Sequence, residues 1–248
     1  MIKSLYCLVV ILLVSCASEK PTGKTEAEIL YKEAMSLAKD ERFLLATEKL
    51  NNLKNQYPYS FYATPAELLQ AEILFKQESY VESAEAFLLF KELHPKHEKI
   101  SYVIYMIAES YYRQMPDTFD RDLDAAIEAR NYYQQLTKLY PDSEQAKEAS
   151  SKISNVSRML RDKEQYVADF YFKTEVYAAA KWRYLDILEH FKDEKLRSHS
   201  MQRIIASSLN LKQYKDCIEY AKIFEKKLLD NDREEAVEAT KECKEKAR

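Results

Sequence analysis

Small side chains recur along this chain at a spacing of 37 residues, and this recurrence limits the folds that the chain can adopt. Ala34, Ala71 and Ala108 lie 37 positions apart. After a gap of 60 positions the pattern resumes at Ala168, and Ile205 takes the next place. A small residue at one position of each unit lets two helices approach closely. The pattern therefore predicts a series of similar helical hairpins.

Aromatic residues and prolines hold fixed places around these small residues. An aromatic residue follows nine positions later in four of the copies, as Phe43, Tyr80, Tyr177 and Tyr214. An aromatic residue or histidine followed by proline ends the first three copies, at 57–58, 94–95 and 140–141. Proline can neither donate a backbone hydrogen bond nor continue a helix, so it marks the end of each second helix.

Glycine content and net charge exclude several other classes of protein. The 248 residues include one glycine and six prolines, and the formal net charge is −3. We therefore expect almost no left-handed turns and no glycine-rich phosphate-binding loop, and a many-stranded β fold is disfavoured for the same reason. The charge balance gives no basic field for nucleic acid, so no nucleic-acid partner is predicted.

The recurring pattern is similar to the tetratricopeptide repeat, a helix–turn–helix unit of about 34 residues, although the consensus tryptophan and glycine are missing. This resemblance implies an all-α tetratricopeptide-repeat α-solenoid of about five helix pairs with a C-terminal cap helix. Because no helix breaker occurs between 143 and 171, the first helix of the fourth pair is expected to be unusually long. A long turn with Pro116 is expected over 115–121. The expected helices are 26–40 with 42–57, 62–78 with 80–94, 98–114 with 121–140, 143–174 with 177–191, 194–212 with 214–230, and a cap over 231–248.

The first residues have the pattern of an export signal. A lysine precedes an apolar run over 5–14, which is too short to cross a hydrocarbon layer of about 30 Å. The four residues that end at Cys16 (Leu-Val-Ser-Cys) resemble the lipobox of bacterial lipoproteins, which implies cleavage before Cys16 and acylation of that residue. We predict a signal peptide over 1–15 and a lipidated tether over 16–25. The alternative is an ordinary secretory peptide with a chance cysteine.

The residues after Cys16 bear on location and on redox state. Ala17 and Ser18 follow it, and the aspartate that retains lipoproteins at the inner membrane of enteric bacteria is missing. By analogy, we predict a lipid-anchored protein on the periplasmic face of the outer membrane. Such a location permits a disulfide between Cys217 and Cys243. Cys217 can equally be a small buried residue of a helix, so the pairing stays open.

Histidine and acidic residues form no recognisable catalytic motif. His94 and His190 occupy the place that tyrosine takes in other copies, so turn packing explains them. His94 and His97 have the spacing of a metal pair, but no cysteine or carboxylate cluster completes it. Without glycines an oxyanion loop is hard to build. We predict no catalytic residue, metal or cofactor and no enzyme activity; the alternative is a periplasmic enzyme on a helical scaffold.

The resemblance to tetratricopeptide repeats also implies a binding groove, because the first helix of each pair lines the concave face in that family. Its candidate residues are mostly aromatic or basic, which suits an extended peptide with apolar side chains and a terminal carboxylate. Alternatively, the aromatic residues belong to the helical core and the lysines interact with helix dipoles. The candidate groove residues are Tyr31, Met35, Lys39, Leu68, Phe75, Lys76, Tyr102, Tyr105, Tyr112, Arg113, Phe172 and Lys173.

Longer motifs resemble the BamD (YfiO-like) family of outer-membrane assembly lipoproteins, over about residues 26–191. An inserted Asp-Arg-Asp turn and the long helix of the fourth pair distinguish this family from generic repeats. Besides the acylated cysteine, the matching motifs are Tyr57-Pro58-Tyr59-Ser60 with Tyr62-Ala63, Tyr105-Met106-Ile107-Ala108 with Tyr111-Tyr112, Phe119-Asp120-Arg121-Asp122, the segment 164–171 and the segment 177–183.

This resemblance implies a lipid-anchored adaptor of the outer-membrane β-barrel assembly machinery. The early repeats, over 26–140, are expected to receive the C-terminal targeting strand of unfolded outer-membrane proteins. The later repeats and cap, over 141–248, are expected to hold the periplasmic repeats of the central barrel-inserting subunit. Arg158, Arg161 and Lys163 make part of the long helix basic, but the sequence leaves open whether that subunit binds there. The alternative is another lipid-anchored repeat protein, such as a pilotin for pilus or secretin assembly or a cell-wall-synthesis regulator.

Overall fold

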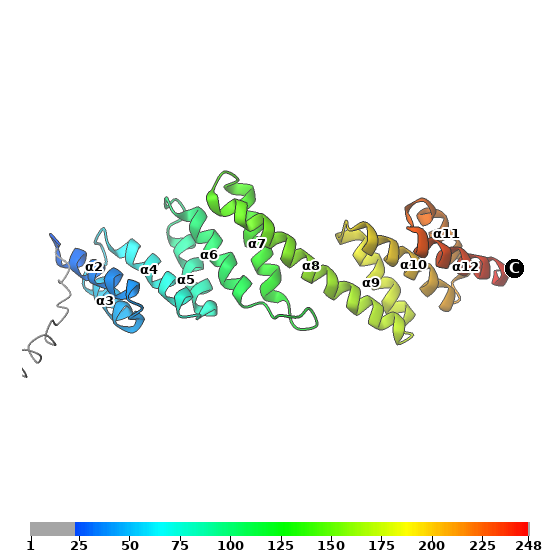
Figure 1. Ribbon diagram of the computed structural model, residues 1–248, viewed down its shortest axis with the longest axis horizontal. Coiled ribbons are helices and arrows are strands. Elements are labelled where there is room, and N and C mark those ends of the chain that lie inside the picture. The colour runs from blue at the N-terminus through cyan, green and yellow to red at the C-terminus, as the bar shows by residue number, and fades with distance from the viewer. Residues whose placement is uncertain (1–22, 248) are drawn as a thin grey trace, which may run out of the picture. The chain divides into compact units, whose positions relative to one another are not determined.

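The computed structural model describes residues 23–247, and within this range the chain forms eleven α-helices and one short 3-10 helix (Figure 1). The predicted all-α repeat fold is confirmed. The signal peptide over 1–15, the lipidation site Cys16 and the tether as far as residue 22 lie outside the described residues. Among the residues described, no helix is both long enough and apolar enough to cross a membrane.

The helices pack as two units. The boundary lies between His97 and Glu98. It concerns helix packing, whereas the functional division expected at residue 140 concerns binding partners and stays a prediction. The first unit contains α2 (Glu26–Lys39), α3 (Phe43–Gln56), α4 (Ala63–Lys76) and α5 (Tyr80–Leu93). The second contains α6 (Ile100–Arg113), α7 (Asp124–Leu139), α8 (Glu144–Lys173), α9 (Tyr177–His190), α10 (Glu194–Asn210), α11 (Tyr214–Phe224), η2 (Glu225–Lys227) and α12 (Asp230–Lys246).

The small residues of the 37-residue pattern are points of close helix contact. Ala34, Ala71, Ala108 and Ala168 are fully buried, and so is Ile205 in the fifth copy. A second series of small residues, in the second helix of each pair, is buried to the same degree. Its members are Ala46, Ser83, Ala129, Ala180 and Cys217. The predicted register of the repeats is therefore confirmed.

Four turns inside the helix pairs contain a left-handed residue that is not glycine. Glu41, Glu78, Glu175 and Lys212 have φ values of 57°, 60°, 63° and 58°. In each turn the N–H of the following residue donates to the carbonyl five positions earlier; Ser79, for example, donates over 3.0 Å. This is the Schellman arrangement, which satisfies carbonyls that a helix end leaves unpaired. The expectation that scarce glycine excludes left-handed turns is therefore wrong.

Replacing Glu78 with glycine is expected to raise the free energy of unfolding by about 0.5–1 kcal/mol. A non-glycine side chain in the left-handed region costs about 1–2 kcal/mol, and glycine removes this cost. The greater conformational freedom of glycine in the unfolded chain offsets only part of this stabilisation. Urea unfolding followed by circular dichroism measures the change. Glu85→Gly, in the exposed middle of α5, is the control and should destabilise by about 1 kcal/mol. Destabilisation by both substitutions would contradict the argument.

The long turn of the third pair is confirmed, but the helix after it begins later than expected. α6 ends at Arg113, before Pro116, and α7 begins at Asp124 instead of residue 121. The carboxylate of Asp122 accepts a hydrogen bond from the backbone N–H of Asp124 at 2.8 Å, which holds the preceding residues in a turn. The buried Leu123 fixes that turn against the second unit.

The predicted long helix is α8, which spans 30 residues and is about 45 Å long at 1.5 Å per residue. Its N-cap is Ser143, whose hydroxyl oxygen accepts from the N–H of Ala146 at 3.3 Å. Near its middle, Val156 and Leu160 belong to one apolar cluster. In its second half Ala168 belongs to another, with residues of α9 to α12. Figure 1 shows the helix running without a break from α7 to α9.

The C-terminal helix is linked to its neighbour by a disulfide. Cys217 on α11 and Cys243 on α12 are bonded, with their Cα atoms 6.5 Å apart, and both side chains are fully buried. Of the two alternatives left open by the sequence, the bridge is the one observed. α11 ends at Phe224, short of the expected residue 230, and the cap helix α12 begins at Asp230.

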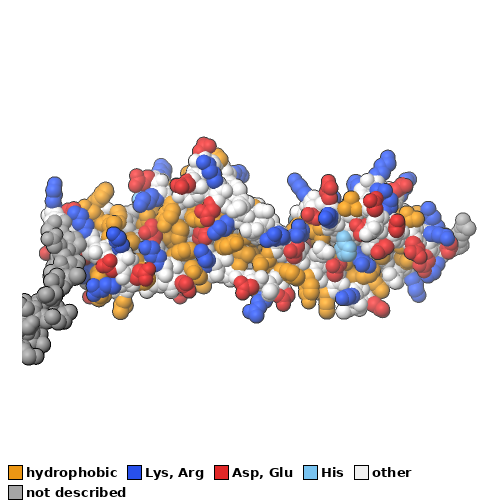
Figure 2. Space-filling view, in the orientation of Figure 1, with side chains coloured by type: hydrophobic (Ala, Val, Ile, Leu, Met, Phe, Trp, Pro, Cys, Tyr) orange, Lys and Arg blue, Asp and Glu red, His pale blue; other side chains and the backbone are white. Residues whose placement is uncertain are grey.

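The surface carries charges of both signs. Figure 2 shows Lys and Arg side chains interspersed with Asp and Glu side chains on the visible face of each unit, with hydrophobic side chains reaching the surface between them. No broad field of one sign covers this face, which agrees with the small net charge of −3.

Candidate functional site

In the first unit, the candidate groove residues of α2 are spaced four apart and so lie on one side of the helix. Met35 is 49% exposed and Lys39 is also exposed. Tyr31 is half-buried, and its ring centroid lies 5.5 Å from that of Tyr62. Burial, and then the nearby carboxylate of Glu72 on α4, raise the pKa of Tyr31. The α2 candidates therefore present an apolar and a basic side chain beside a fixed aromatic ring.

The candidates on α4 differ in how much surface they offer. Leu68 is only 4% exposed, so its side chain belongs to the helix packing and does not form an open groove wall. Phe75 is partly buried and lies edge-on to Tyr80, with ring centroids 5.3 Å apart. Lys76 is exposed at the end of the helix. For Leu68, the alternative that groove candidates belong to the core holds.

In the second unit, the tyrosines of α6 are held by aromatic packing. Tyr105 and Tyr112 each lie with their ring centroid 6.2 Å from that of the buried Tyr133 on α7. Tyr102 is partly buried as well, whereas Arg113 is exposed at the end of the helix. Each of these three tyrosine rings is therefore partly packed into the protein and partly accessible to solvent.

Beside these tyrosines lies a buried charged cluster that the sequence analysis missed. Glu109 on α6 is 4% exposed and accepts hydrogen bonds from the hydroxyl of Tyr133 and, at 2.5 Å, from the ammonium of Lys152 on α8. The Lys152 ammonium also lies 4.6 Å from the centre of the Tyr112 ring. Burial, and then the hydrogen bond to Glu109, raise the pKa of Tyr133, so its hydroxyl stays a donor. The sequence signal that could have indicated this cluster is Glu109 itself, an acidic residue within the otherwise mostly apolar helix expected over 98–114.

The last two groove candidates border a cleft of about 480 Å³ formed by residues of α8 and α10. The guanidinium of Arg203 lies 4.5 Å from the centre of the Phe172 ring. Within residues 23–247 this guanidinium has no hydrogen-bond or ion-pair partner, so its N–H donors are available to a ligand. The cleft is lined by Tyr166, Asp169, Phe170, Phe172, Lys173, His199 and Arg203.

The carboxylate of Asp169 in this cleft is already engaged. The hydroxyl of Tyr184 donates to its Oδ1 at 2.6 Å, and Nε2 of His199 lies 2.8 Å from the same oxygen. Burial raises the pKa of Asp169, but these two contacts and the nearby charge of Arg203 outweigh burial and hold the pKa below its usual value. Asp169 therefore stays ionised at neutral pH.

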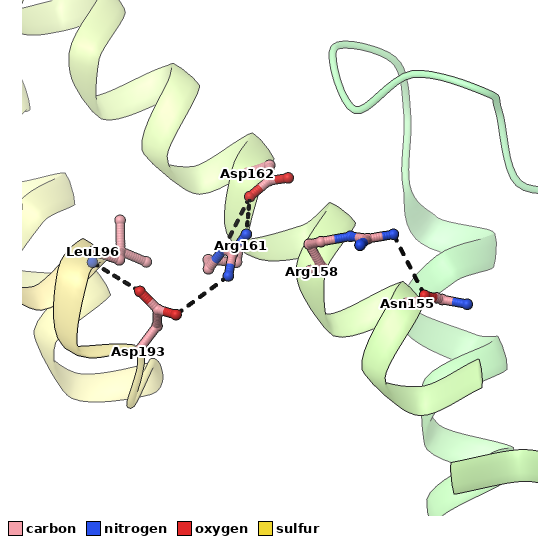
Figure 3. A network of polar contacts seen from close by, with 6 residues as sticks. All are labelled: Asn155, Arg158, Arg161, Asp162, Asp193 and Leu196. Carbon is pink, nitrogen blue, oxygen red and sulfur yellow. Dashed lines mark hydrogen bonds and ion pairs between the residues drawn. The ribbon is translucent and has the colours of Figure 1, made fainter. Parts of the chain in front are cut away.

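One basic residue near the middle of α8 stabilises the second unit internally (Figure 3). The guanidinium of Arg161 lies 2.7 Å from the Asp162 carboxylate and 3.4 Å from that of Asp193. Asp193 in turn caps α10, because its other carboxylate oxygen accepts from the N–H of Leu196 at 2.9 Å. Arg161 thus joins α8 to the start of α10.

The other two basic residues of this stretch differ from each other. The ammonium of Lys163 donates to the backbone carbonyl of Arg121, in the long turn before α7. Arg158 is exposed, and among the residues that the structure describes its guanidinium contacts the side chain of Asn155 alone, at 3.4 Å (Figure 3). Arg158 is therefore the most available of the three to a binding partner. Because Arg161 and Lys163 are engaged within the protein, this part of the helix is less basic than the sequence predicts.

A family model described as an outer membrane lipoprotein, YfiO, matches residues 24–222. The chain belongs to the YfiO outer membrane lipoprotein family. Among similar relatives, outer membrane protein assembly factor BamD of Rickettsia prowazekii is 27% identical over 225 residues, which is 89% of each chain. BamD of Vibrio cholerae is 27% identical over 182 residues, 70% of this chain and 76% of that one.

The solved structures that resemble the chain include the TPR2AB-domain:pHSP90 complex of yeast Sti1. It covers 91% of this chain and 100% of its own, at 13% identity and a TM-score of 0.42. Membership of the YfiO family confirms both the resemblance found in the sequence motifs and the expected location, a lipid-anchored protein on the periplasmic face of the outer membrane. In the described part of the chain, no group of three or more His, Cys, Asp or Glu residues could hold a metal ion.

Proposed function

We propose that this protein is a lipid-anchored, non-enzymatic adaptor in the assembly of outer-membrane proteins. It binds the C-terminal strand of unfolded outer-membrane proteins, and it holds the central barrel-inserting subunit through that subunit's periplasmic repeats. Family membership and the names of the relatives, outer membrane protein assembly factors, support the proposal. The structural observation that carries it is the aromatic cleft beside Phe172, where the Arg203 guanidinium lies over the ring. On this proposal the end of the strand binds within 141–248, and not within 26–140 as the family resemblance implies.

The chemistry of the cleft suits the end of a barrel strand. Such a strand alternates apolar residues and ends in an aromatic residue with a free carboxylate. Phe170 and Phe172 offer an aromatic surface, and Arg203 can donate two parallel hydrogen bonds to a carboxylate. Because Tyr184 and His199 engage Asp169, that carboxylate does not form a salt bridge with Arg203. We therefore assign the terminal carboxylate to Arg203.

Arg203→Gln is expected to weaken the binding of a synthetic barrel-strand peptide by about ten- to a hundredfold, because a charge-assisted hydrogen bond to a carboxylate contributes about 1.5–3 kcal/mol. Fluorescence anisotropy with a labelled peptide that ends in a free phenylalanine carboxylate measures the change. Arg158→Gln, at an exposed arginine of α8, is the matched control and should leave the affinity unchanged.

The amidated form of the same peptide separates recognition of the terminal carboxylate from nonspecific hydrophobic binding. It should bind the wild-type protein as weakly as the acid binds Arg203→Gln, and it should not respond to that substitution. Equal affinities of acid and amide for the wild-type protein would overturn the assignment of Arg203. Photocrosslinkers at Phe75, Tyr112 and Phe172 then test which helices the strand contacts, and no crosslink at any of the three would refute peptide binding at the candidate groove.

The second partner is tested by affinity purification from detergent-solubilised envelopes, followed by mass spectrometry. We expect a β-barrel protein that carries periplasmic repeat domains to co-purify with the chain. Arg158→Glu, at the exposed basic residue of α8, should reduce its recovery if the long helix is part of the interface. Recovery of a secretin in place of such a barrel protein would favour the pilotin alternative.

A further inference from the structure

The turn between α3 and α4 displays two aromatic side chains to solvent. Tyr59 is 100% exposed and Phe61 is 85% exposed, which makes them the most exposed large hydrophobic side chains within residues 23–247. Two large exposed aromatic side chains in one short turn give an apolar surface of the kind that contacts another apolar phase or partner. Neither the peptide cleft nor α8 accounts for them.

The turn is well ordered, so the exposure of its rings is fixed by the backbone. The N–H of Ser60 donates to the carbonyl of Tyr57, and the N–H of Ala63 donates to the carbonyl of Ser60, both at 3.0 Å. The N–H of Tyr62 donates to the hydroxyl of Ser60 at 3.2 Å. The Phe61 ring packs edge-on to Tyr62, at 5.5 Å between centroids, and leaves its outer face in solvent.

The same turn lies beside the point where the lipidated tether enters the first helix. The hydroxyl of Tyr57 donates to the carboxylate of Glu26, the first residue of α2. Thr25, the N-cap of that helix, is only nine positions after Cys16 in the sequence. At about 3.3–3.6 Å per residue the tether reaches no more than about 30 Å. An acylated Cys16 therefore holds this end of the first hairpin close to the bilayer.

We propose that Tyr59 and Phe61 insert into the membrane–water interface beside the lipid anchor and fix the orientation of the first unit on the bilayer. Aromatic residues favour this interface because the ring enters the apolar layer while the tyrosine hydroxyl stays hydrated. Two independent attachments also anchor a protein more firmly than one, as with paired lipid signals. The proposal rests on the lipid anchor and on neither of the two proposed protein partners.

Tryptophan fluorescence with lipid quenchers tests the proposal on the full lipidated chain. The chain has one tryptophan, so Trp182→Phe provides a silent background. Phe61→Trp is placed in that background, and Leu44→Trp is the matched control. Leu44 is 82% exposed and stands at the opposite end of α3, away from the turn. Both proteins are reconstituted into phosphatidylglycerol–phosphatidylcholine vesicles with brominated or ordinary acyl chains.

We expect the Phe61→Trp emission to shift to shorter wavelength and to lose roughly half of its intensity in brominated vesicles, as befits a ring at the membrane interface. The Leu44→Trp emission should not respond. Equal quenching of the two variants, or quenching of neither, would overturn the proposal. An emission shift that needs a purified assembly partner and is insensitive to bromine would assign the turn to a protein contact instead. Binding of the strand peptide should be the same in both variants, which separates this test from that of the cleft.

Discussion

Lys152→Met is expected to lower the free energy of unfolding of the second unit by about 3–5 kcal/mol, because it leaves a buried carboxylate without its counter-ion. The side chain of Glu109 is only 6% exposed, and that of Lys152 is 18% exposed. The two groups lie on α6 and α8, and Tyr133 of α7 bonds to the same carboxylate oxygen. Three helices thus depend on one ion pair.

A second substitution tests whether the loss comes from the stranded charge. Glu109→Gln with Lys152→Met removes both charges and keeps an amide oxygen that can accept from Tyr133. Replacing a buried ion pair with neutral groups is often close to neutral, so the double variant should recover most of the lost stability. Recovery would identify the stranded charge as the cause.

Urea unfolding followed by the fluorescence of Trp182 on α9 reports on the second unit. Lys147→Met is the matched control, since Lys147 is an exposed lysine of the same helix and should change stability by no more than about 0.5 kcal/mol. If Lys152→Met behaved like this control, the buried pair would contribute nothing measurable, and the tyrosine packing alone would hold the three helices together.

Removing the disulfide is expected to destabilise the C-terminal end of the protein by about 3–4 kcal/mol, the chain-entropy value for a bridge across 26 residues. The other buried side chains of α12 are the small residues Ala236 and Ala239, which bury little apolar area. The bridge therefore supplies much of what holds this helix against α11.

The double variant, which carries Cys217→Ala and Cys243→Ala in one chain, is compared with the wild-type protein by thermal unfolding. Hydrogen exchange should show faster exchange of the amides of α12 in the double variant. A reducing agent should shift the wild-type melting temperature toward that of the double variant and leave the variant unchanged. An unshifted melting temperature of the reduced wild-type protein would show that the helix is held without the bridge.

The fold could be predicted from the sequence because its determining contacts repeat. Ala34, Ala71, Ala108 and Ala168 recur at equivalent positions of close helix contact, and each is fully buried. The left-handed turns could not be predicted, because Glu78 and its equivalents are not residues that this conformation favours. They are held by backbone hydrogen bonds, which do not require a particular type of side chain and so give no signal in the sequence.

The candidate site was predicted only in part, because its decisive contacts join distant segments. Phe172 and Lys173 were identified from their place in the repeat, but Arg203 lies on α10 and meets Phe172 only after folding. The contact between Asp169 and His199 also joins α8 to α10. No spacing rule in the sequence links such pairs, so the contribution of Arg203 to the cleft could not be predicted.

The unbroken length of α8 has a mechanical consequence. No glycine or proline occurs between Glu144 and Lys173, so the helix has no hinge. Arg158, which is exposed near its middle, and Phe172, which lines the cleft, are 14 residues or about 21 Å apart along the same axis. A force applied at one of these positions is transmitted to the other. Under the proposed function, a subunit docked near Arg158 would therefore tilt the side of the cleft that holds the end of the client strand.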